Sequence, residues 1–228
     1  ISLLGASAAL YYSFASPPIG DAGVLGGLVM IDGFAGFFRI VFSFVAVVTI
    51  LFSWSSEEIM GKGREHKGEY YALIALMTGG MMVMAEARDL VMLFMSMELV
   101  ALTSYVMAGY MRNSLRSTEA SLKYVIFGAV SSGIMLFGMS LLFGMTGQMT
   151  FVGIRDALVA NPVNELSMLV VLIMIMAGFG YKIAMVPFHF WCPDVYEGAP
   201  TPVSAFFSVG PKAAGFALMI RFFFTVFQ

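Results

Sequence analysis

Long apolar runs separated by short polar segments extend along the whole chain. Taking about 20 apolar residues as one crossing of a bilayer, we predict about seven spans. They are 1–14, 34–54, 70–87, 89–110, 115–145, 166–190 and 200–226. The first is shorter than one crossing, and the last has no stop signal before Gln228, so we expect both to be truncated. The pattern predicts an all-α, polytopic transmembrane helix bundle that forms a single domain over residues 1–228, since no linker divides it.

Lysine and arginine gather in two of the connecting loops. These are Lys62, Arg64 and Lys67 in the loop 55–69 and Arg112 and Arg116 in the loop 111–116, while the other side has only Arg88 and Arg155. With alternating spans, the two richer loops fall on one side of the membrane. Because cytoplasmic loops carry an excess of these residues, we expect that side to face the cytoplasm or its organellar equivalent.

Composition supports the bilayer as the solvent of this chain. Hydrophobic residues make up 60% and charged residues 11% of the 228 residues, whereas a soluble domain carries about 25% charged residues. A net charge of −2 provides no basis for nucleic-acid binding. Cys192 is a single cysteine, and His66 and His189 are too few for a bis-histidine haem. No metal-ligand or phosphate-loop spacing is present, so we expect no cofactor in this chain.

Four ionisable residues interrupt the apolar spans: Glu98, Lys123, Lys182 and Lys212. Each costs about 2.5–3.5 kcal/mol if it is charged and isolated at mid-membrane, so pairing, hydration or partial neutralisation is required. Glu98 lies about nine residues into its span, or roughly 13 Å deep. We interpret it as a carboxylate that pairs with a lysine and so sets that lysine's proton affinity. The alternative is a structural carboxylate bonded to a neighbouring helix.

Two of the lysines accompany prolines. Lys182 precedes Pro187 by five residues and Lys212 follows Pro211 directly, and an interior proline removes a backbone hydrogen bond and kinks or breaks a helix. We therefore predict discontinuous helices at both prolines, of the kind that transporters use to build ion sites. Desolvation disfavours a charged lysine and a carboxylate favours it, so such residues suit a proton relay. The alternative for Lys182 is snorkelling to the headgroups.

Three further side chains leave alternatives open. Glu119 precedes Lys123 by four residues, the favourable order for a helical ion pair, so Lys123 is either a relay group or part of an interfacial salt bridge. His189 is either a proton carrier between Lys182 and Lys212 or a hydrogen-bonded structural residue. Arg39 lies close in sequence to Asp32 and to a helix start, which favours an interface anchor over a buried partner.

Two blocks of sequence resemble a known family. They are KIAMVPFHFWCPDVYEGAPTPVSAFFSVGPKAAGFALMIR, from Lys182 to Arg221, and MELVALTSYVMAGYMRNSLRSTEASLKYVIFGAVSSGIML, from Met97 to Leu136. Both are similar to the antiporter-like subunit N, or subunit 2, of respiratory complex I (NADH:quinone oxidoreductase). The stretch PDVYEGAPTPV separates this subunit from its sisters L and M. The resemblance covers most of the chain from about residue 70 onward.

The resemblance implies a fold and a function. Members have fourteen helices in two inverted five-helix repeats and bind no redox centre. This chain would correspond to helices two to eight, with the first repeat at approximately 70–228 and without the helix-twelve lysine of the second repeat. Glu98 resembles the helix-five glutamate of the family, Lys123 its helix-six lysine, Lys182 the lysine of broken helix seven, and Lys212 the helix-eight lysine.

The implied function is proton translocation coupled to quinone reduction elsewhere in the complex. The implied partners are other membrane-arm subunits, lipid and protons, in a prokaryotic plasma membrane or an equivalent energy-converting inner membrane. Two rivals remain: a cation/proton antiporter or membrane-bound hydrogenase subunit, which shares the buried lysines, and a structural assembly subunit. Enzyme action on a soluble substrate is disfavoured, since no nucleophile-base set or cofactor motif is visible.

Overall fold

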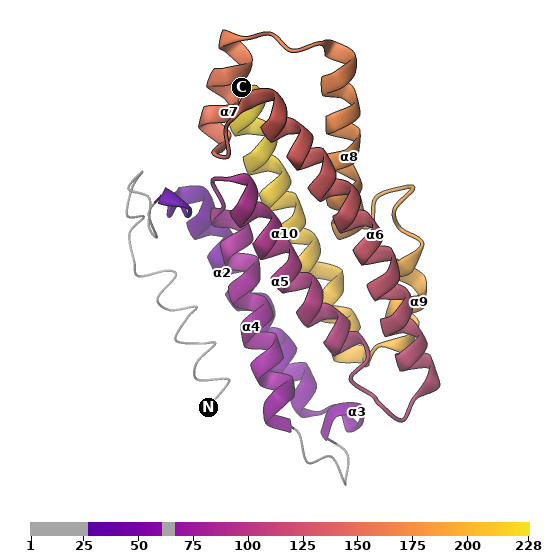
Figure 1. Ribbon diagram of the computed structural model, residues 1–228. Helices are drawn as coiled ribbons and strands as arrows, with labels where there is room; N and C mark the ends of the chain where they lie inside the picture. Colours follow the sequence, from indigo (N-terminus) through magenta and orange to yellow (C-terminus); the bar gives the residue numbers. More distant parts are fainter. Residues whose placement is uncertain (1–26, 61–66) are drawn as a thin grey trace.

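The computed structural model describes residues 27–60 and 67–228, and within these ranges the chain is helical with no strands (Figure 1). Two isolated β-bridges join Val29 to Ala87 and Asp89 to Thr150. The helices are α2 (Gly33–Trp54), α3 (Glu57–Met60), α4 (Lys67–Glu86), α5 (Leu90–Ala108), α6 (Leu115–Thr146), α7 (Phe151–Ala160), α8 (Glu165–Ile183), α9 (Trp191–Gly198) and α10 (Thr201–Phe227).

Local sequence signals account for several helix ends. The side chain of Asp32 accepts a hydrogen bond of 2.8 Å from the Ala35 N–H at the start of α2, and Asp89 accepts one of 2.6 Å from the Met92 N–H at the start of α5. Such caps satisfy backbone donors that have no partner inside the helix. At the other end, α6 stops at Gly147, whose φ of 66° is accessible to glycine at little cost.

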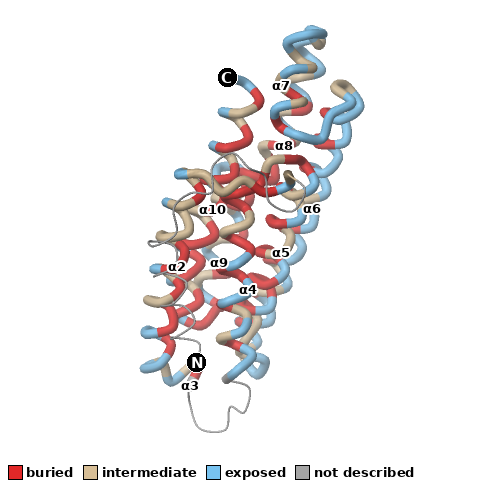
Figure 2. Tube along the Cα trace, turned by 90° about the vertical axis from the view of Figure 1, so that its left-hand side faces the viewer, coloured by how far each residue is buried: buried red, intermediate tan, exposed pale blue. Residues whose placement is uncertain are grey.

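Helix α10 lies in the middle of the bundle. It packs against α2, α4, α5, α7, α8 and α9, and Figure 1 shows it in yellow passing behind α5 and α6. Figure 2 shows buried positions concentrated in the middle of the bundle and exposed positions along its outside, notably along α6. Buried methionines, among them Met77, Met81 and Met135, fill the core as flexible packing groups.

Among the described helices, five are long and apolar enough to cross a membrane: α2, α5, α6, α8 and α10. Large apolar side chains such as Leu102, Phe137 and Ile173 are exposed on their outer faces, which suits lipid or a protein partner rather than water. Helix α4 matches the predicted span 70–87 in position but lies outside this set of five. It is packed between α2, α5 and α10, so it meets protein more than lipid and needs less apolar surface.

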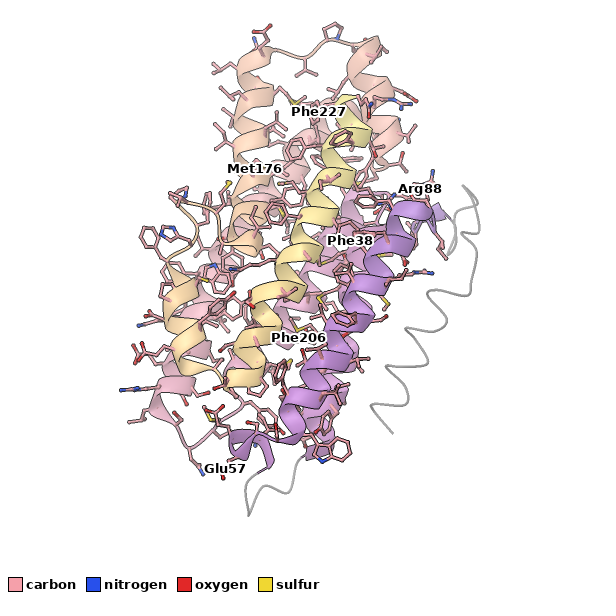
Figure 3. All side chains as sticks on the ribbon, turned by 180° about the vertical axis from the view of Figure 1, so that it is seen from behind. Phe38, Glu57, Arg88, Met176, Phe206 and Phe227 are labelled. Carbon is pink, nitrogen blue, oxygen red and sulfur yellow. The ribbon has the colours of Figure 1, made fainter. Side chains whose placement is uncertain are left out.

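The helix ends that flank the two loops rich in lysine and arginine lie at the same end of the bundle, whereas Lys62 and Arg64 lie outside the described residues. Figure 1 shows α2 ending, α4 starting and the α5–α6 connection at the bottom of the view. In Figure 3, Glu57 lies at the bottom of the view and Arg88 well above it. The described ends of the two loops agree with the predicted alternation of spans, and which side faces the cytoplasm stays a prediction.

Two predicted elements differ from the structure, and a third lies outside the described residues. The span 166–190 is too long, because α8 ends at Ile183 and the chain turns away well before Phe190. The break predicted at Pro211 is wrong, because α10 runs from Thr201 to Phe227 with Pro211 inside it. A proline removes only one helical hydrogen bond, and the dense packing of this buried turn holds the helix together. The predicted span 1–14 lies outside the described residues.

Candidate functional site

Lys182 lies in the core, at the last turn of α8. It is 3% exposed, and its Nζ has no hydrogen-bond partner in the part of the chain that the structure describes. The stem of the side chain packs on α10 at Gly215, where an added Cβ would lie 3.1 Å from Lys182 Cγ. Lys182 is thus buried inside the protein, which argues against snorkelling to the headgroups, and its depth in the membrane stays a prediction.

The chain breaks directly after Lys182. Ala184 takes a left-handed conformation with φ of 58°, and the Met185 N–H bonds back to the Gly180 carbonyl at 2.7 Å. The segment through Pro187 is irregular until α9 begins at Trp191. A discontinuous helix was predicted here, and its end falls closer to Lys182 than the position of Pro187 alone suggests. Helix ends inside a membrane protein are tolerated only where protein or a watery cavity surrounds them.

Glu98 approaches Lys182 from α5. The carboxyl group is half-buried and interacts electrostatically with Lys182 and with the tyrosines Tyr105 and Tyr181. Removing a charged lysine from water is costly, and a nearby carboxylate offsets part of that cost. The structure therefore places the carboxylate within electrostatic range of the lysine that sequence analysis paired with it, with no direct ion pair between them among the described residues.

Lys212 reaches from α10 toward α9. Its Nζ lies 3.8 Å from Cys192 Sγ and 5.1 Å from the centre of the Tyr196 ring, in a cation–π contact. Lys212 is three residues before Gly215, so the two share one face of α10. The stem of Lys182 packs on Gly215, so Lys212 is attached to α10 about one helical turn from the place where Lys182 contacts that helix. Sequence analysis missed Cys192 and Tyr196 as neighbours, although both lie in the segment that carries the family resemblance.

Lys123 occupies a different environment. Its Nζ forms ion pairs of 2.7 Å with Glu119 and 2.8 Å with Asp194 of α9, and its side chain is 39% exposed. The sequence left open whether Lys123 is a relay group or part of a salt bridge. The structure shows the salt bridge with Glu119, and Asp194 is an additional partner. Together with Arg116 and Glu197, these groups line a charged pocket of about 160 Å³. Lys123 is thus held apart from the buried Glu98–Lys182 pair.

His189 lies in the irregular segment between α8 and α9. Its Nδ1 is buried without a hydrogen-bond partner in the described ranges, and its ring stacks on Phe190 with centroids 4.8 Å apart. The interpretation as a structural histidine held by hydrogen bonds finds no support at Nδ1. Its role as a proton carrier between the two lysines stays a prediction.

A second group of charges, which sequence analysis did not assemble, joins α2, α4 and α10. Arg221 of α10 is 7% exposed and binds Asp32 through two hydrogen bonds of 2.8 and 3.0 Å. It also donates to the Ala85 carbonyl at 2.6 Å. Arg39 pairs with Glu86 at 2.5 Å; sequence analysis had named no partner for Arg39, and its place at the membrane interface stays a prediction.

The Asp32 carboxyl responds to these neighbours. Partial burial by itself raises the pKa of Asp32, but the hydrogen bonds from the Arg221 guanidinium and the Ala35 N–H outweigh burial and hold that pKa below its ordinary value. The carboxylate is therefore ionised near neutral pH, and the bidentate pair is charge-assisted. This group ties α10 to α2 and α4 at one end of the bundle.

Comparison with known proteins decides the family. Residues 87–228 match the family described as NADH:quinone oxidoreductase/Mrp antiporter, transmembrane. The chain belongs to this family. Over 223 residues it is 44% identical to NADH-quinone oxidoreductase subunit N 2 of Chloroherpeton thalassium, covering 98% of this chain and 44% of that protein.

Solved structures agree with this assignment. A chain of respiratory complex I from Thermus thermophilus matches with a TM-score of 0.78 at 30% identity, covering 96% of this chain and 46% of the other. A chain of the membrane-bound sulfane sulfur reductase, an archaeal respiratory membrane complex, matches with a TM-score of 0.81 at 28% identity, covering 99% and 46%. This chain thus spans less than half the length of these relatives.

The predicted family and the predicted fold class are both confirmed by these matches. The chain is a multi-pass integral membrane protein of the antiporter-like family, and its bacterial relatives support a place in the prokaryotic plasma membrane. The roles predicted for Glu98, Lys123, Lys182, Lys212 and His189 stay predictions.

Proposed function

We propose that this chain is part of the proton-translocating subunit N of NADH:quinone oxidoreductase. In this proposal it is a non-redox subunit that moves protons while quinone is reduced elsewhere in the complex. One observation carries the proposal: Lys182 is buried without a hydrogen-bond partner in the described residues, at a helix break and within electrostatic reach of Glu98. A buried ionisable group of this kind marks an ion pathway in membrane proteins.

The pair Glu98–Lys182 acts as the control point in this proposal. While the carboxylate stays close, the ammonium form of Lys182 is stabilised against the cost of burial. When redox energy released elsewhere in the complex changes the pairing, the stabilisation is lost and Lys182 releases its proton. The helix end directly after Lys182 supports this proposal, because a broken helix leaves backbone groups that water can join.

Lys212 is the next acceptor in the proposed path. Its position one helical turn from the place where Lys182 packs on α10 favours transfer between them through water. Lys123 and its acidic partners Glu119 and Asp194 lie at a more exposed pocket, which suits an entry point for protons. From the resemblance to subunit N we also propose that residues 70–228 approximately form the first five-helix repeat. The remainder of a complete proton path is proposed from the same resemblance.

The partners are proposed from the relatives. Subunit N belongs to NADH-quinone oxidoreductase in the relatives that match this chain, so we infer that other membrane-arm subunits cover part of its exposed apolar surface. Lipid covers the rest.

The test is NADH-driven proton uptake in inverted membrane vesicles that contain the full-length protein in its complex. Lys182→Ala and Glu98→Ala should each lower the protons moved per NADH oxidised at normal complex yield. Arg155→Ala removes an exposed charge on α7 that pairs with neighbouring Asp156 and should leave the ratio unchanged. Normal proton uptake in both Lys182→Ala and Glu98→Ala at normal yield would reject the proposal.

Two other functions predict different results in the same assay. The family description includes Mrp antiporters, so a cation/proton antiporter is the second candidate, and it predicts proton movement that depends on added sodium and not on NADH. An assembly subunit predicts that Lys182→Ala lowers the yield of the complex but leaves the protons moved per complex unchanged.

A further inference from the structure

Two tyrosine hydroxyls meet above a gap in the surface of α6. The gap is Gly128, where an added Cβ would lie 1.8 Å from Tyr105 Oη and 2.8 Å from Tyr181 Oη. Both hydroxyls therefore rest against the α6 backbone in space that every other residue type would fill with its Cβ. The two hydroxyls therefore lie next to each other over Gly128. Gly128 thus allows a contact between α5 and α8 across α6.

The direction of the hydrogen bonds follows from the number of protons. Tyr181 Oη donates to the Tyr124 carbonyl of α6 at 3.0 Å. A phenol has one proton to donate, so Tyr181 has none left for Tyr105, and any hydrogen bond between the two hydroxyls has Tyr105 as its donor. The hydroxyl of α8 is thus fixed to the backbone of α6, with the hydroxyl of α5 beside it.

Tyr181 is held at its backbone as well as at its hydroxyl. Its carbonyl accepts from Trp191 Nε1 of α9 at 3.2 Å and from the Ala184 N–H at 3.2 Å. The next residue along the chain is Lys182, in the last turn of α8. The place of the lysine therefore depends on how firmly Tyr181 is held.

The surroundings exclude water from these bonds. Tyr105, Tyr124 and Tyr181 are 8%, 2% and 4% exposed. The Tyr124 ring stacks on Trp191 with centroids 4.5 Å apart and meets Tyr105 edge-on at 4.9 Å. Hydrogen bonds in such an interior are stronger than in water, and leaving one unmade is costly.

We propose that Tyr105 and Tyr181 are positioning residues for proton transfer, and that their adjacent hydroxyls over Gly128 hold the last turn of α8 so that Lys182 stays within electrostatic range of Glu98. The inference rests on the proposed function of the Glu98–Lys182 pair. Neither tyrosine exchanges the transported proton. Each acts through the position of Lys182, and Glu98 interacts electrostatically with both tyrosines.

The experiment compares three changes in the full-length protein within its complex. Tyr105→Phe removes one hydroxyl and keeps the ring. Gly128→Ala keeps both hydroxyls and displaces them. Gly133→Ala is the matched control on the same helix, because an added Cβ there meets nothing within 4 Å. Inverted vesicles report the protons taken up per NADH oxidised across a range of pH, and the yield of the complex is measured in parallel.

In Tyr105→Phe and Gly128→Ala, the protons moved per NADH should fall by a factor of about three or more, because small displacements of reacting groups have large effects on transfer. The alkaline limb of the pH profile should also move to lower pH, since Lys182 is no longer held where Glu98 stabilises its ammonium form. Gly133→Ala should match the wild type. In the double variant Gly128→Ala/Tyr105→Phe, the yield should recover because part of the clash is gone, while proton uptake stays low.

A wild-type ratio and pH profile in Tyr105→Phe would overturn the positioning role. A lower yield with an unchanged ratio and pH profile would also overturn it, because that is the result of a purely structural contact. Lys182→Ala, measured alongside, separates the two proposals. If Lys182→Ala moves fewer protons per NADH while Tyr105→Phe matches the wild type, only the positioning role fails. If Lys182→Ala pumps normally, the proposed function fails too.

Discussion

Replacing Arg221 with leucine is expected to lower the free energy of unfolding by about 3–5 kcal/mol, the cost of breaking a buried ion pair from one side. Arg221 donates to the Ala85 carbonyl and, through both terminal nitrogens, to Asp32. Leucine keeps part of the apolar volume but leaves a carboxylate and a carbonyl without their partner.

The magnitude follows from the three hydrogen bonds and from exposure. A hydrogen bond to a charged group contributes about 1.5–3 kcal/mol, so three such bonds would exceed the expected loss if nothing replaced them. The side chain of Asp32 is 24% exposed, and water can solvate part of the carboxylate once Arg221 is gone. The expected loss therefore lies at the lower end of that sum.

The assay is unfolding of the purified protein in mixed micelles with increasing denaturing detergent, followed by circular dichroism. Arg155→Leu, which removes an exposed arginine from α7, is the control and should have a small effect. Asp32→Asn keeps an oxygen that can cap α2, and a double-mutant cycle with Arg221→Leu isolates the energy of the pair. A loss below about 1 kcal/mol for Arg221→Leu, the range of exposed pairs, would refute the reasoning.

The same pair predicts how stability depends on pH. The folded pKa of Asp32 lies below its unfolded value of 3.8, so the stabilisation is fully present above that value and is lost as pH falls through the lower folded pKa. The difference in stability between the wild type and Arg221→Leu should be constant above about pH 5 and shrink below about pH 4. A constant difference down to pH 3 would show that another group carries the effect.

Two further predictions test the packing around α9. An added Cβ at Gly198 would lie 2.6 Å from the Arg116 carbonyl oxygen. Because the backbone cannot move aside, Gly198→Ala should lower the free energy of unfolding by about 1–3 kcal/mol in the detergent titration, and Gly133→Ala should leave it unchanged. Equal stability of the two variants would contradict the close approach. Asp194→Asn should barely change stability, because Lys123 is exposed and keeps Glu119 as a partner. It should slow proton uptake if the charged pocket around Lys123 is the entry point for protons. An unchanged rate of proton uptake at every pH would argue against that entry point.

Apolar run length was enough to place most of the helices. The predicted span 115–145 corresponds to α6 (Leu115–Thr146), and the span 89–110 corresponds to α5 (Leu90–Ala108). Backbone groups cannot stay unpaired in lipid, so a long apolar run has to be helical whatever its neighbours are. The depth predicted for Lys182 rests on the same counting, because each helical residue adds a fixed rise.

Tertiary structure alone separated residues that look alike in the sequence. Pro187 and Pro211 are both interior prolines near a lysine, yet only the first lies in a break, since Pro211 is packed inside α10. Lys123 and Lys182 both interrupt apolar runs, but one meets two carboxylates at the edge of the bundle and the other is buried without a partner in the described residues. Burial depends on which helix faces which, and run length does not contain that information.

Partner choice shows the same limit over longer distances. Asp32 lies seven positions from Arg39 in the sequence, yet it binds Arg221 near the other end of the chain, and Arg39 turns to Glu86. The chain alone determined that these are charged groups at helix ends, where capping and membrane depth act locally. The pairing depended on α2, α4 and α10 converging, because an ion pair forms between groups that are close in space, whatever their separation along the chain.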